Sequence, residues 1–293
     1  MNEFYQKRYV EERLTNHFTK EVLINQVRSV HGGDINAAYQ LFTNHGTYFL
    51  KMNSSTKYPG MFEQESNGLQ VISATNSLRV PEVILFDEGA EDSFLLLEWI
   101  EQESPSVNFW GDFGRKLAQM HRISREKFGW SSDNYIGTLK QQNTWNSSWF
   151  DFFVEQRLEA QLKLGIEQGK IQGKLNRLFE KLFPKLEGML PRERTALVHG
   201  DLWSGNFMVA KNGQPMVMDP AAYYGHREVD LAMTKLFGGF SEEMYHAYNE
   251  FYPLESGWEE RVDLYNLYPL LVHVNLFGGG YVDQVERICM RFL

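Results

Sequence analysis

Residues 197–206 read Leu-Val-His-Gly-Asp-Leu-Trp-Ser-Gly-Asn, and residues 216–220 read Met-Val-Met-Asp-Pro. Between these stretches, Asn212-Gly213 is a strong signal for a two-residue β-hairpin turn, because both residue types tolerate a positive φ. A turn centred there places Asn206 directly opposite Asp219 on paired strands, where Cβ atoms lie about 4.5–5.5 Å apart. An amide oxygen and a carboxylate at that separation can share one hard cation such as Mg²⁺.

Asp201 lies five residues before Asn206, at the end of the loop that enters this hairpin. Transfer of a phosphoryl group to an alcohol needs a carboxylate that accepts the hydroxyl proton, oxygen ligands for Mg²⁺ and a cation that holds the phosphates. Asp201 fits the first role, and Asn206 with Asp219 fits the second. These residues therefore predict a kinase that uses ATP and Mg²⁺.

The spacing from Asp201 to Asn206 resembles the catalytic loop of protein kinases, in which His-Arg-Asp precedes an Asn. Gly200 stands in place of the Arg, and His-Gly-Asp at this position is similar to the aminoglycoside phosphotransferase and choline kinase branch, whose substrates are small molecules. Asp219-Pro220 stands where protein kinases carry Asp-Phe-Gly. An Asp-rich turn beside an ordinary hairpin could produce one of these motifs, but the joint match of four residues favours the kinase: His199, Asp201, Asn206 and Asp219.

The cation that holds the phosphates is expected in the first half of the chain. Lys51 lies at the end of a strand pattern, in a position like the Lys of the kinase motif Val-Ala-Ile-Lys, although a lone strand Lys is more often solvated. An inward Lys needs a carboxylate, and Glu65 on the next helix is the candidate, since Glu63 lies on a different helical face. Gly32 and Gly33 are expected in a loop over the ATP phosphates, and a plain turn fits them nearly as well.

The order of expected elements describes an α+β chain with two lobes. We predict a small antiparallel β lobe over residues 1–100, which binds ATP, and a larger, mainly helical lobe over residues 101–293, which carries catalysis and substrate. The expected strands are 38–42, 47–52, 80–86, 93–99 and one β segment over 207–218; the expected helices are 8–30, 61–75, one capped by Asp112, 149–164, 172–187, 242–252 and 258–275.

Glu98, Trp99 and Ile100 end the last strand of the first lobe and precede a polar connector at residues 101–105. This position is that of the hinge in kinases, where the backbone N–H and C=O groups read the edge of adenine. The end of an ordinary edge strand is the alternative interpretation of the same three residues.

Composition argues against several other classes of protein. The formal net charge of −9 makes nucleic acid an improbable partner, because such a surface repels polyanions. Apolar runs such as residues 94–97 end far short of the roughly 20 residues that a membrane-spanning helix needs, and the N-terminus has no apolar signal region. The single cysteine, Cys289, cannot form a disulfide within the chain. We expect a cytoplasmic protein with no membrane partner.

Residues 199–206, with Trp after Asp-Leu, resemble the fructosamine and ketosamine kinases, whereas aminoglycoside phosphotransferases generally lack this Trp. Residues 49–53, 61–65, 149–153, 219–233 and 237–240 resemble that family too, so the resemblance spans essentially the whole chain. It implies a bilobal protein-kinase-like fold and ATP-dependent phosphorylation of the C3 hydroxyl of a ketoamine, on a protein or on a free amino acid. The 3-phosphate then decomposes and frees the amine, which amounts to deglycation.

The resemblance also implies roles for individual side chains. Trp203 is expected to pack on the sugar or amine portion of the substrate. His226, Glu228 and Asp230 are candidates for contact with the substrate, and the bracing of a loop fits them at least as well. His199 is expected to hold the catalytic loop rather than to react.

Two other functions stay open at this point. The first is a kinase of a different small molecule, such as an aminoglycoside, choline or homoserine, which a panel of acceptors would separate. The second is a pseudokinase that binds nucleotide without catalysis, and the complete set of Lys51, Asp201, Asn206 and Asp219 argues against it.

Overall fold

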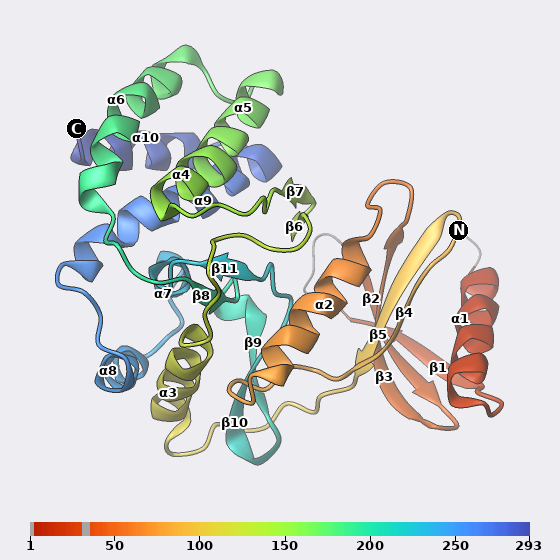
Figure 1. Cartoon of the computed structure of the whole chain (residues 1–293). Helices are drawn as coiled ribbons and strands as arrows, with labels where there is room; N and C mark the ends of the chain where they lie inside the picture. Colours follow the sequence, from red (N-terminus) through yellow and green to blue (C-terminus); the bar gives the residue numbers. More distant parts are fainter. Residues whose placement is uncertain (1–2, 31–35) are drawn as a thin grey trace.

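The computed structural model of the chain describes residues 3–30 and 36–293 (Figure 1). The sequence forms a lobe built on an antiparallel sheet, followed by a mainly helical lobe, as predicted. Gly32 and Gly33, which we expect over the phosphates, lie outside the described residues.

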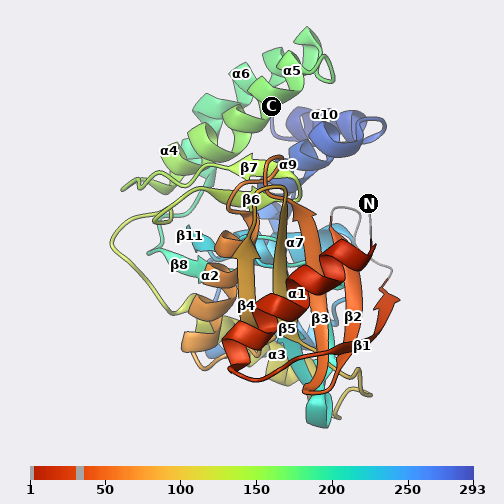
Figure 2. The same cartoon turned by 90° about the vertical axis from the view of Figure 1, so that its right-hand side faces the viewer.

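The sheet lobe has five antiparallel strands in the order β1-β2-β3-β5-β4. Helix α1 covers one face of this sheet and α2 lies on the other, between the sheet and the helical lobe (Figures 1 and 2). The bounds are α1 Glu3–Phe18, β1 Ile24–Ser29, β2 Ala37–Thr43, β3 Gly46–Ser54, α2 Met61–Ala74, β4 Val83–Glu88 and β5 Asp92–Glu98.

Strand β5 is buried on both faces because successive side chains of a strand point to opposite sides. Phe94 and Leu96 pack in a cluster with α1, whereas Leu95 and Leu97 pack in the larger core that includes residues of α2. This explains why an unbroken apolar run, rather than an alternating one, forms the central strand next to β3.

The prediction of one helix over residues 8–30 is wrong in its second half. Helix α1 ends at Phe18, and Thr19 has a left-handed backbone with φ 54°. Residues Ile24–Ser29 instead form β1, which pairs with β2 at the edge of the sheet and exposes all of its residues except Ile24. An edge strand with one buried residue carries no clear alternation, so only the pairing with β2 reveals it.

The helical lobe begins after a connector at residues 99–108. Asp112 lies in the first turn of α3 and does not cap it, since α3 begins at Phe109 after Asn108. The other predicted helices are present, with the stretch 149–167 interrupted by a π-helical segment. The bounds are α3 Phe109–His121, α4 Trp149–Phe153, π-helix Val154–Glu159, α5 Ala160–Glu167, α6 Gly173–Met189, α7 Glu228–Leu236, α8 Glu242–Phe251, α9 Trp258–Phe277 and α10 Tyr281–Arg291.

Three two-stranded sheets lie within the described part of the helical lobe, where the sequence indicates only one. The predicted hairpin is β9 Phe207–Ala210 with β10 Gln214–Val217, and the two others are β6 Asn134–Ile136 with β7 Leu139–Gln141, and β8 Ala196–Val198 with β11 Tyr223–Gly225. A three-residue strand is too short to show a period of two, which is why the sequence does not predict these pairs.

Two further sequence expectations can be compared directly with the structure. Cys289 is free and buried on α10, and burial raises the pKa of its thiol to about 12. No helix in the described ranges has both the length and the apolar character that crossing a membrane requires.

A buried network of charges joins the start of α7 to α9. Arg227 binds Glu193 with two N–O distances of 2.7 Å, and Arg261 binds Glu228 at 2.6 and 2.8 Å. His226 is fully buried between them and stacks on the Tyr265 ring at 5.4 Å. Burial lowers the pKa of His226 to about 3, so this imidazole is neutral in the folded protein. Each guanidinium group of the network is paired with one carboxylate, so no charge in it is buried without a partner of opposite charge.

The first prediction concerns the contact between α3 and α8. A Cβ atom on Gly114 would lie 2.1 Å from the backbone oxygen of Met244, so Gly114→Ala should force the two helices apart and lower the free energy of unfolding by about 2–3 kcal/mol. Gly188→Ala in α6 is the matched control, because no atom lies within 4 Å of the position that its Cβ would take, and it should be neutral or stabilise by up to about 1 kcal/mol. Urea unfolding of both variants measures this, and equal effects would contradict it.

The second prediction concerns acid stability. The pKa of His226 is about 3 in the folded chain against about 6.5 when unfolded, so the unfolded chain binds an extra proton as the pH falls below 6.5. The stability that the neutral imidazole provides is present above pH 6.5 and is lost progressively down to about pH 3, by roughly 2 kcal/mol at pH 5.

The variant His226→Phe keeps a ring against Tyr265 and removes this titration. Its free energy of unfolding should fall less steeply between pH 6 and pH 4 than that of the parent chain, by about 1.4 kcal/mol per pH unit. Urea unfolding at several pH values compares the two slopes. Parallel slopes would show that His226 does not titrate as its burial requires.

Candidate active site

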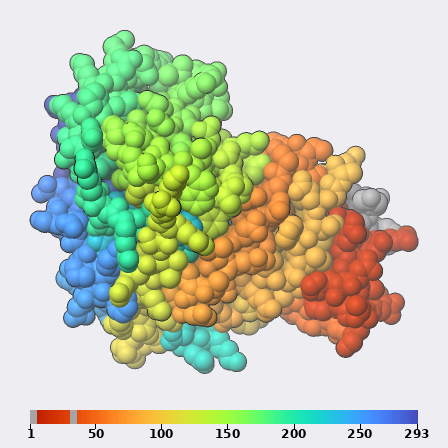
Figure 3. Space-filling view, viewed as in Figure 1, coloured from red at the N-terminus to blue at the C-terminus, as the bar shows by residue number. Residues whose placement is uncertain are grey.

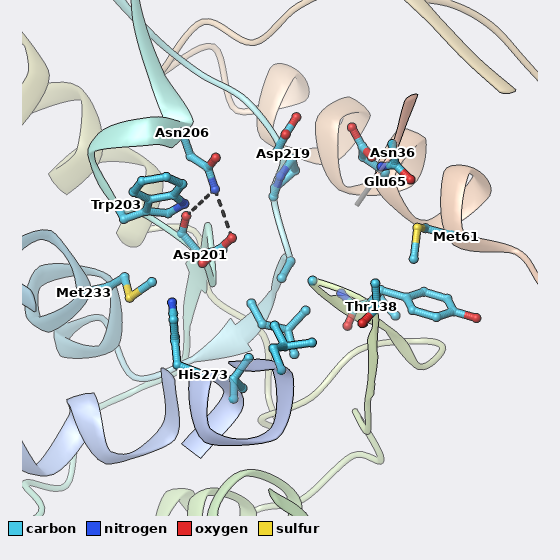
Figure 4. Close-up of a pocket in the computed structure, with 18 of the residues that line it drawn as sticks. Asn36, Met61, Glu65, Thr138, Asp201, Trp203, Asn206, Asp219, Met233 and His273 are labelled. Carbon is cyan, nitrogen blue, oxygen red and sulfur yellow. Dashed lines mark hydrogen bonds between the residues drawn. The ribbon is translucent and has the colours of Figure 1, made fainter. Parts of the chain in front are cut away.

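A cavity of about 760 Å³ lies between the two lobes and contains the predicted catalytic residues. Its walls come from β3 and α2 of the sheet lobe, and from the β6–β7 hairpin, the segments at 201–206 and 219–221, and helices α7, α9 and α10. Figure 4 shows Asp201 beside Asn206, with Asp219 between this pair and Glu65. The convergence of these side chains on one cleft is what the sequence predicts.

Asp201 follows β8 and lines the cleft beside Asn206. The Asn206 amide nitrogen donates to the Asp201 carboxylate at 3.0 Å and to its backbone oxygen at 2.8 Å. Burial raises the pKa of the Asp201 carboxyl to about 7, although the hydrogen bond from Asn206 opposes this shift. A carboxylate with a pKa near neutrality is suited to accept the proton of a hydroxyl group.

The loop that carries Asp201 is held by buried polar groups. Asp230 on α7 accepts hydrogen bonds from the backbone N–H groups of His199 and Gly200 at 2.6 and 2.8 Å. It also accepts one from His121 Nε2 at 3.0 Å. Burial acts to raise the pKa of Asp230, but the hydrogen bond and charge of His121 outweigh it and lower that pKa. Asp230 is therefore an ionised brace beneath the catalytic loop.

His199 and Gly200 have separate reasons to occupy this loop. The His199 Nε2 donates to the backbone oxygen of Met218 at 2.9 Å, so its Nδ1 accepts the 3.3 Å bond from the Asp201 N–H. Gly200 has φ 82°, and a Cβ atom there would lie 2.2 Å from the backbone oxygen of Ala221. The Arg of the protein-kinase pattern could not stand at this position, and the expected structural role of His199 agrees with its contacts.

The predicted register of the β9–β10 hairpin is wrong by one residue. The loop has three residues, Lys211 to Gly213. The Met218 N–H donates to the backbone oxygen of Asn206 at 3.0 Å, so Met218 and not Asp219 continues the ladder opposite Asn206. The connector sets this loop, since Glu103 accepts the Asn212 N–H at 2.9 Å. The three-residue loop thus depends on a tertiary contact that the Asn-Gly signal does not contain.

Asp219 still reaches the cleft because its own backbone changes direction. Its φ of 56° is unusual for a residue other than Gly, and Asp is one of the few residue types that tolerate this conformation. The Asn206 amide nitrogen is bound to Asp201, so its oxygen is turned toward the side on which Asp219 lies (Figure 4). Amide and carboxylate oxygens are suitable ligands for Mg²⁺.

Lys51 on β3 lies between two carboxylates, of which the sequence predicts one. Its Nζ is 2.7 Å from Glu65 on α2 and 2.5 Å from Asp219. Burial acts to lower the pKa of Lys51, but Asp219 and Glu65 together outweigh it and raise that pKa. Burial raises the pKa of Glu65, and the charge of Lys51 opposes this. The pairing with Glu65 is confirmed, and the contact with Asp219 is an addition from the structure.

The hinge residues do not line this cavity. Glu98 ends β5, its N–H donates to the Glu82 oxygen at 2.9 Å, and its carboxylate binds Arg79 at 2.9 and 3.0 Å. Trp99 donates its indole N–H to Glu101 at 2.7 Å. The role of Glu98, Trp99 and Ile100 in adenine binding stays a prediction.

Trp203 is 37% exposed and lines the cleft. It lies at the aromatic end of the cleft, which is the end lined by Trp203, Phe237, His273, Phe277 and Tyr281. Its ring contacts Phe237 at 6.2 Å, and Phe237 contacts His273 at 5.2 Å. The His273 Nδ1 donates to the Pro269 oxygen at 2.7 Å, so its Nε2 is left as an acceptor. Burial lowers the pKa of His273, which favours this neutral form. The sequence does not mark His273, because a single His within a long helical pattern has no characteristic spacing to other polar residues.

The structure does not bring His226 and Asp230 into the cleft, which contradicts the idea that they bind substrate. Both side chains are almost completely buried, and so is Glu228. His226 and Glu228 belong to the charge network described above, and Asp230 braces the catalytic loop. Their alternative role, the bracing of structure, is the one that their contacts support.

Comparisons with known proteins show the family of this chain. The fructosamine kinase family model matches residues 6–293. A probable ketoamine kinase from Synechocystis sp. is 43% identical over 272 residues, which are 92% of this chain and 91% of that protein. A chloroplastic protein-ribulosamine 3-kinase from Arabidopsis thaliana is 41% identical over 282 residues, which are 94% of this chain and 84% of that protein.

Solved structures with a similar fold include a kinase of the same family and a more distant small-molecule kinase. A crystal structure from Haemophilus somnus, assigned as a fructosamine-3-kinase, matches with a TM-score of 0.90 and 30% identity, and covers 100% of both chains. The choline kinase LicA of Streptococcus pneumoniae shares the fold at a TM-score of 0.65 and 16% identity, with 98% of each chain covered. The fold is thus the bilobal one of small-molecule kinases, and the chain belongs to the fructosamine kinase family.

Proposed function

We propose that this protein transfers the γ-phosphoryl group of ATP to the C3 hydroxyl of a ketosamine, such as a fructosamine or a ribulosamine. The observation that carries the proposal is the meeting of Asp201, Asn206, Asp219 and Lys51 in one cleft with the aromatic wall at Trp203. The names of the relatives, ketoamine kinase and protein-ribulosamine 3-kinase, support the same acceptor class. Decomposition of the 3-phosphate would then free the amine and complete deglycation.

In the proposed reaction, Asp201 orients the C3 hydroxyl and accepts its proton as the sugar oxygen attacks the γ-phosphorus. The new P–O bond forms while the bond to the β-phosphate oxygen breaks, and ADP leaves with that electron pair. Lys51 would hold the α- and β-phosphates, with Glu65 fixing its ammonium group at 2.7 Å. These groups act by position and charge, which is the main contribution that a protein makes to phosphoryl transfer.

Asn206 and Asp219 are the residues that would hold Mg²⁺. Their oxygen donors fit this hard cation, and the Asn206 nitrogen is bound to Asp201, which directs the amide oxygen away from that residue. When bound, the cation would neutralise charge on the phosphates. Asp219 also contacts Lys51 at 2.5 Å, so ATP binding is expected to exchange this contact for contacts with the phosphates.

The aromatic end of the cleft is the proposed acceptor site. Trp203 would pack on the sugar or amine portion, and the neutral His273 Nε2 would accept a hydrogen bond from a hydroxyl or an ammonium group of the substrate. Tyr281 and Phe277 extend this wall, and Phe277 is 58% exposed, so the amine part of a larger substrate could leave the cleft there.

The lobe boundary after residue 100 and the cytoplasmic location stay predictions of the sequence.

A panel of acceptors tests the proposed function. ATP consumption is measured with a fructosamine, a ribulosamine, choline, homoserine and kanamycin under the same conditions. Turnover with the first two acceptors alone is the expected result. Turnover with choline, homoserine or kanamycin instead would identify a different small-molecule kinase, and ATP binding without transfer to any acceptor would identify a pseudokinase.

Replacing Asp201 with Asn is expected to lower kcat by about 10³-fold or more, since the amide cannot accept the hydroxyl proton. The affinity for ATP, measured by calorimetry with Mg²⁺ present, should change little. Asp133→Asn is the matched control, since Asp133 lies outside the cleft lining, and it should keep kcat within about twofold. Full activity of the Asp201→Asn protein would remove this residue from the mechanism.

Replacing Trp203 with Ala is expected to raise KM for the ketosamine by at least about tenfold, because a large aromatic contact surface is lost. KM for ATP should stay within about twofold of its original value. Trp145→Ala is the control, since Trp145 has a similar exposure of 43% and does not line the cleft. If both variants show the same steady-state kinetics as the parent enzyme, Trp203 does not contact the acceptor.

A further inference from the structure

The β6–β7 hairpin forms part of the cleft wall but has no role in the reaction proposed above. Its strands pair Asn134 with Gln141 and Ile136 with Leu139, and the two-residue loop Gly137-Thr138 closes it. Gly137 has φ 60°, which this tight loop requires. The tip at Thr138 faces the cavity (Figure 4), so the hairpin lies beside the reacting groups.

A buried amide network attaches this hairpin to the helical lobe. The Asn134 Oδ1 accepts hydrogen bonds from Gln141 and Asn143, both at 2.8 Å. The amide nitrogens of Asn134 and Gln141 donate to the backbone oxygens of Ala222 and Ala221 at 3.0 and 3.1 Å. Ala221 and Ala222 closely follow Asp219 in the chain. The hairpin is therefore held at a fixed place relative to the proposed metal ligand.

Arg157, from the π-helical segment, completes this attachment. Its side chain is fully buried, and no carboxylate of the described residues forms an ion pair with it. It donates to Asn143 Oδ1 at 2.7 Å and to the Gln142 oxygen at 2.5 Å, and it lies over the Tyr223 ring at 4.1 Å. A buried guanidinium that binds mainly oxygens of the segment after β7 makes that segment rigid.

The opposite side of the hairpin reaches the sheet lobe. The Tyr135 hydroxyl donates to the Pro59 oxygen at 2.9 Å, and the Ser132 hydroxyl donates to Gln64 Oε1 at 2.7 Å. Pro59 lies just before α2, and Gln64 lies in its first turns, next to Glu65. The space-filling view shows the yellow-green surface of the helical lobe in contact with the orange surface of the sheet lobe (Figure 3).

We infer that the β6–β7 hairpin sets the position of the N-terminal end of α2, and so of Glu65, relative to Asp201 and Asp219. Tyr135 and Ser132 are positioning residues in this account, because they act through α2 and Glu65. The sheet holds α2 through one apolar face, with Phe62 and Leu69 in the core. The same core includes residues of the helical lobe, and a Cβ atom on Gly68 would lie 3.2 Å from Pro220, so apolar packing places the middle of α2 against that lobe. Tyr135 and Ser132 add the polar contacts at the N-terminal end of the helix, close to Glu65. The inference rests on the proposed function of Lys51 and Glu65.

The test combines Tyr135→Phe with Ser132→Ala in the full-length chain. Both changes keep the shape of the side chain and remove one hydroxyl each. Tyr58→Phe with Ser131→Ala is the matched control, since no hydrogen bond of these two hydroxyl groups is seen in the described residues and the rings of Tyr58 and Tyr135 contact each other at 6.5 Å.

The expected result for the test variant is a kcat about tenfold lower, with KM for the ketosamine within about twofold and Tm within about 2 °C of the parent chain. Hydrogen exchange of residues 61–74 should be faster, whereas exchange in α3 and α9 should not change. A single Ser132→Thr protein keeps the hydroxyl and should keep kcat. The control variant should match the parent chain in every measurement.

Unchanged kcat and unchanged exchange in α2 would overturn the inference, and so would a lower Tm with an unchanged kcat, which indicates a purely structural role. The exchange measurement needs no acceptor. If the parent chain turns over no ketosamine, the proposed function fails, but the exchange rates of α2 still decide whether the hairpin holds this helix.

Discussion

A buried lysine that contacts one carboxylate from each lobe links the two halves of this enzyme. Lys51 on β3 is 5% exposed and lies within 2.7 Å of Glu65 and 2.5 Å of Asp219. Burial of an unpaired ammonium group would cost several kcal/mol, so the two carboxylates are a condition for its position. Because Glu65 comes from the sheet lobe and Asp219 from the helical lobe, this cluster can form only when the lobes are correctly placed.

Two other sets of contacts support this cluster without taking part in it. Asp230 holds the backbone of the catalytic loop at His199 and Gly200, which places Asp201 beside Asn206. The connector fixes the β9–β10 loop through Glu103, which decides the register that leads to Asp219. Polar side chains, buried at Asp230 and exposed at Glu103, thus hold the backbone where it follows an irregular path. The buried Asp230 is stable there because its hydrogen bonds are satisfied.

The helical lobe also explains the placement of residues that the sequence marks as candidates for substrate contact. His226, Glu228 and Asp230 are close to the catalytic motif in the chain, yet their side chains point into the core. Their closeness to the motif in the sequence therefore does not place their side chains in the cleft. His273 shows the converse, since it is far from the motif in sequence and lines the cleft from α9.

The amino-acid sequence by itself determined the class of chemistry, the two-lobed α+β organisation and the pairing of Lys51 with Glu65. Those features depend on local patterns, namely the spacing of Asp201 and Asn206, the apolar strands around β5, and the helical spacing that separates Glu65 from Glu63. Only the tertiary structure decided the strand at 24–29, the register that places Met218 opposite Asn206, and the place of the β6–β7 hairpin beside α2. The physical reason is that short or exposed strands and single hydrogen bonds are selected by distant partners, which no local pattern of residues contains.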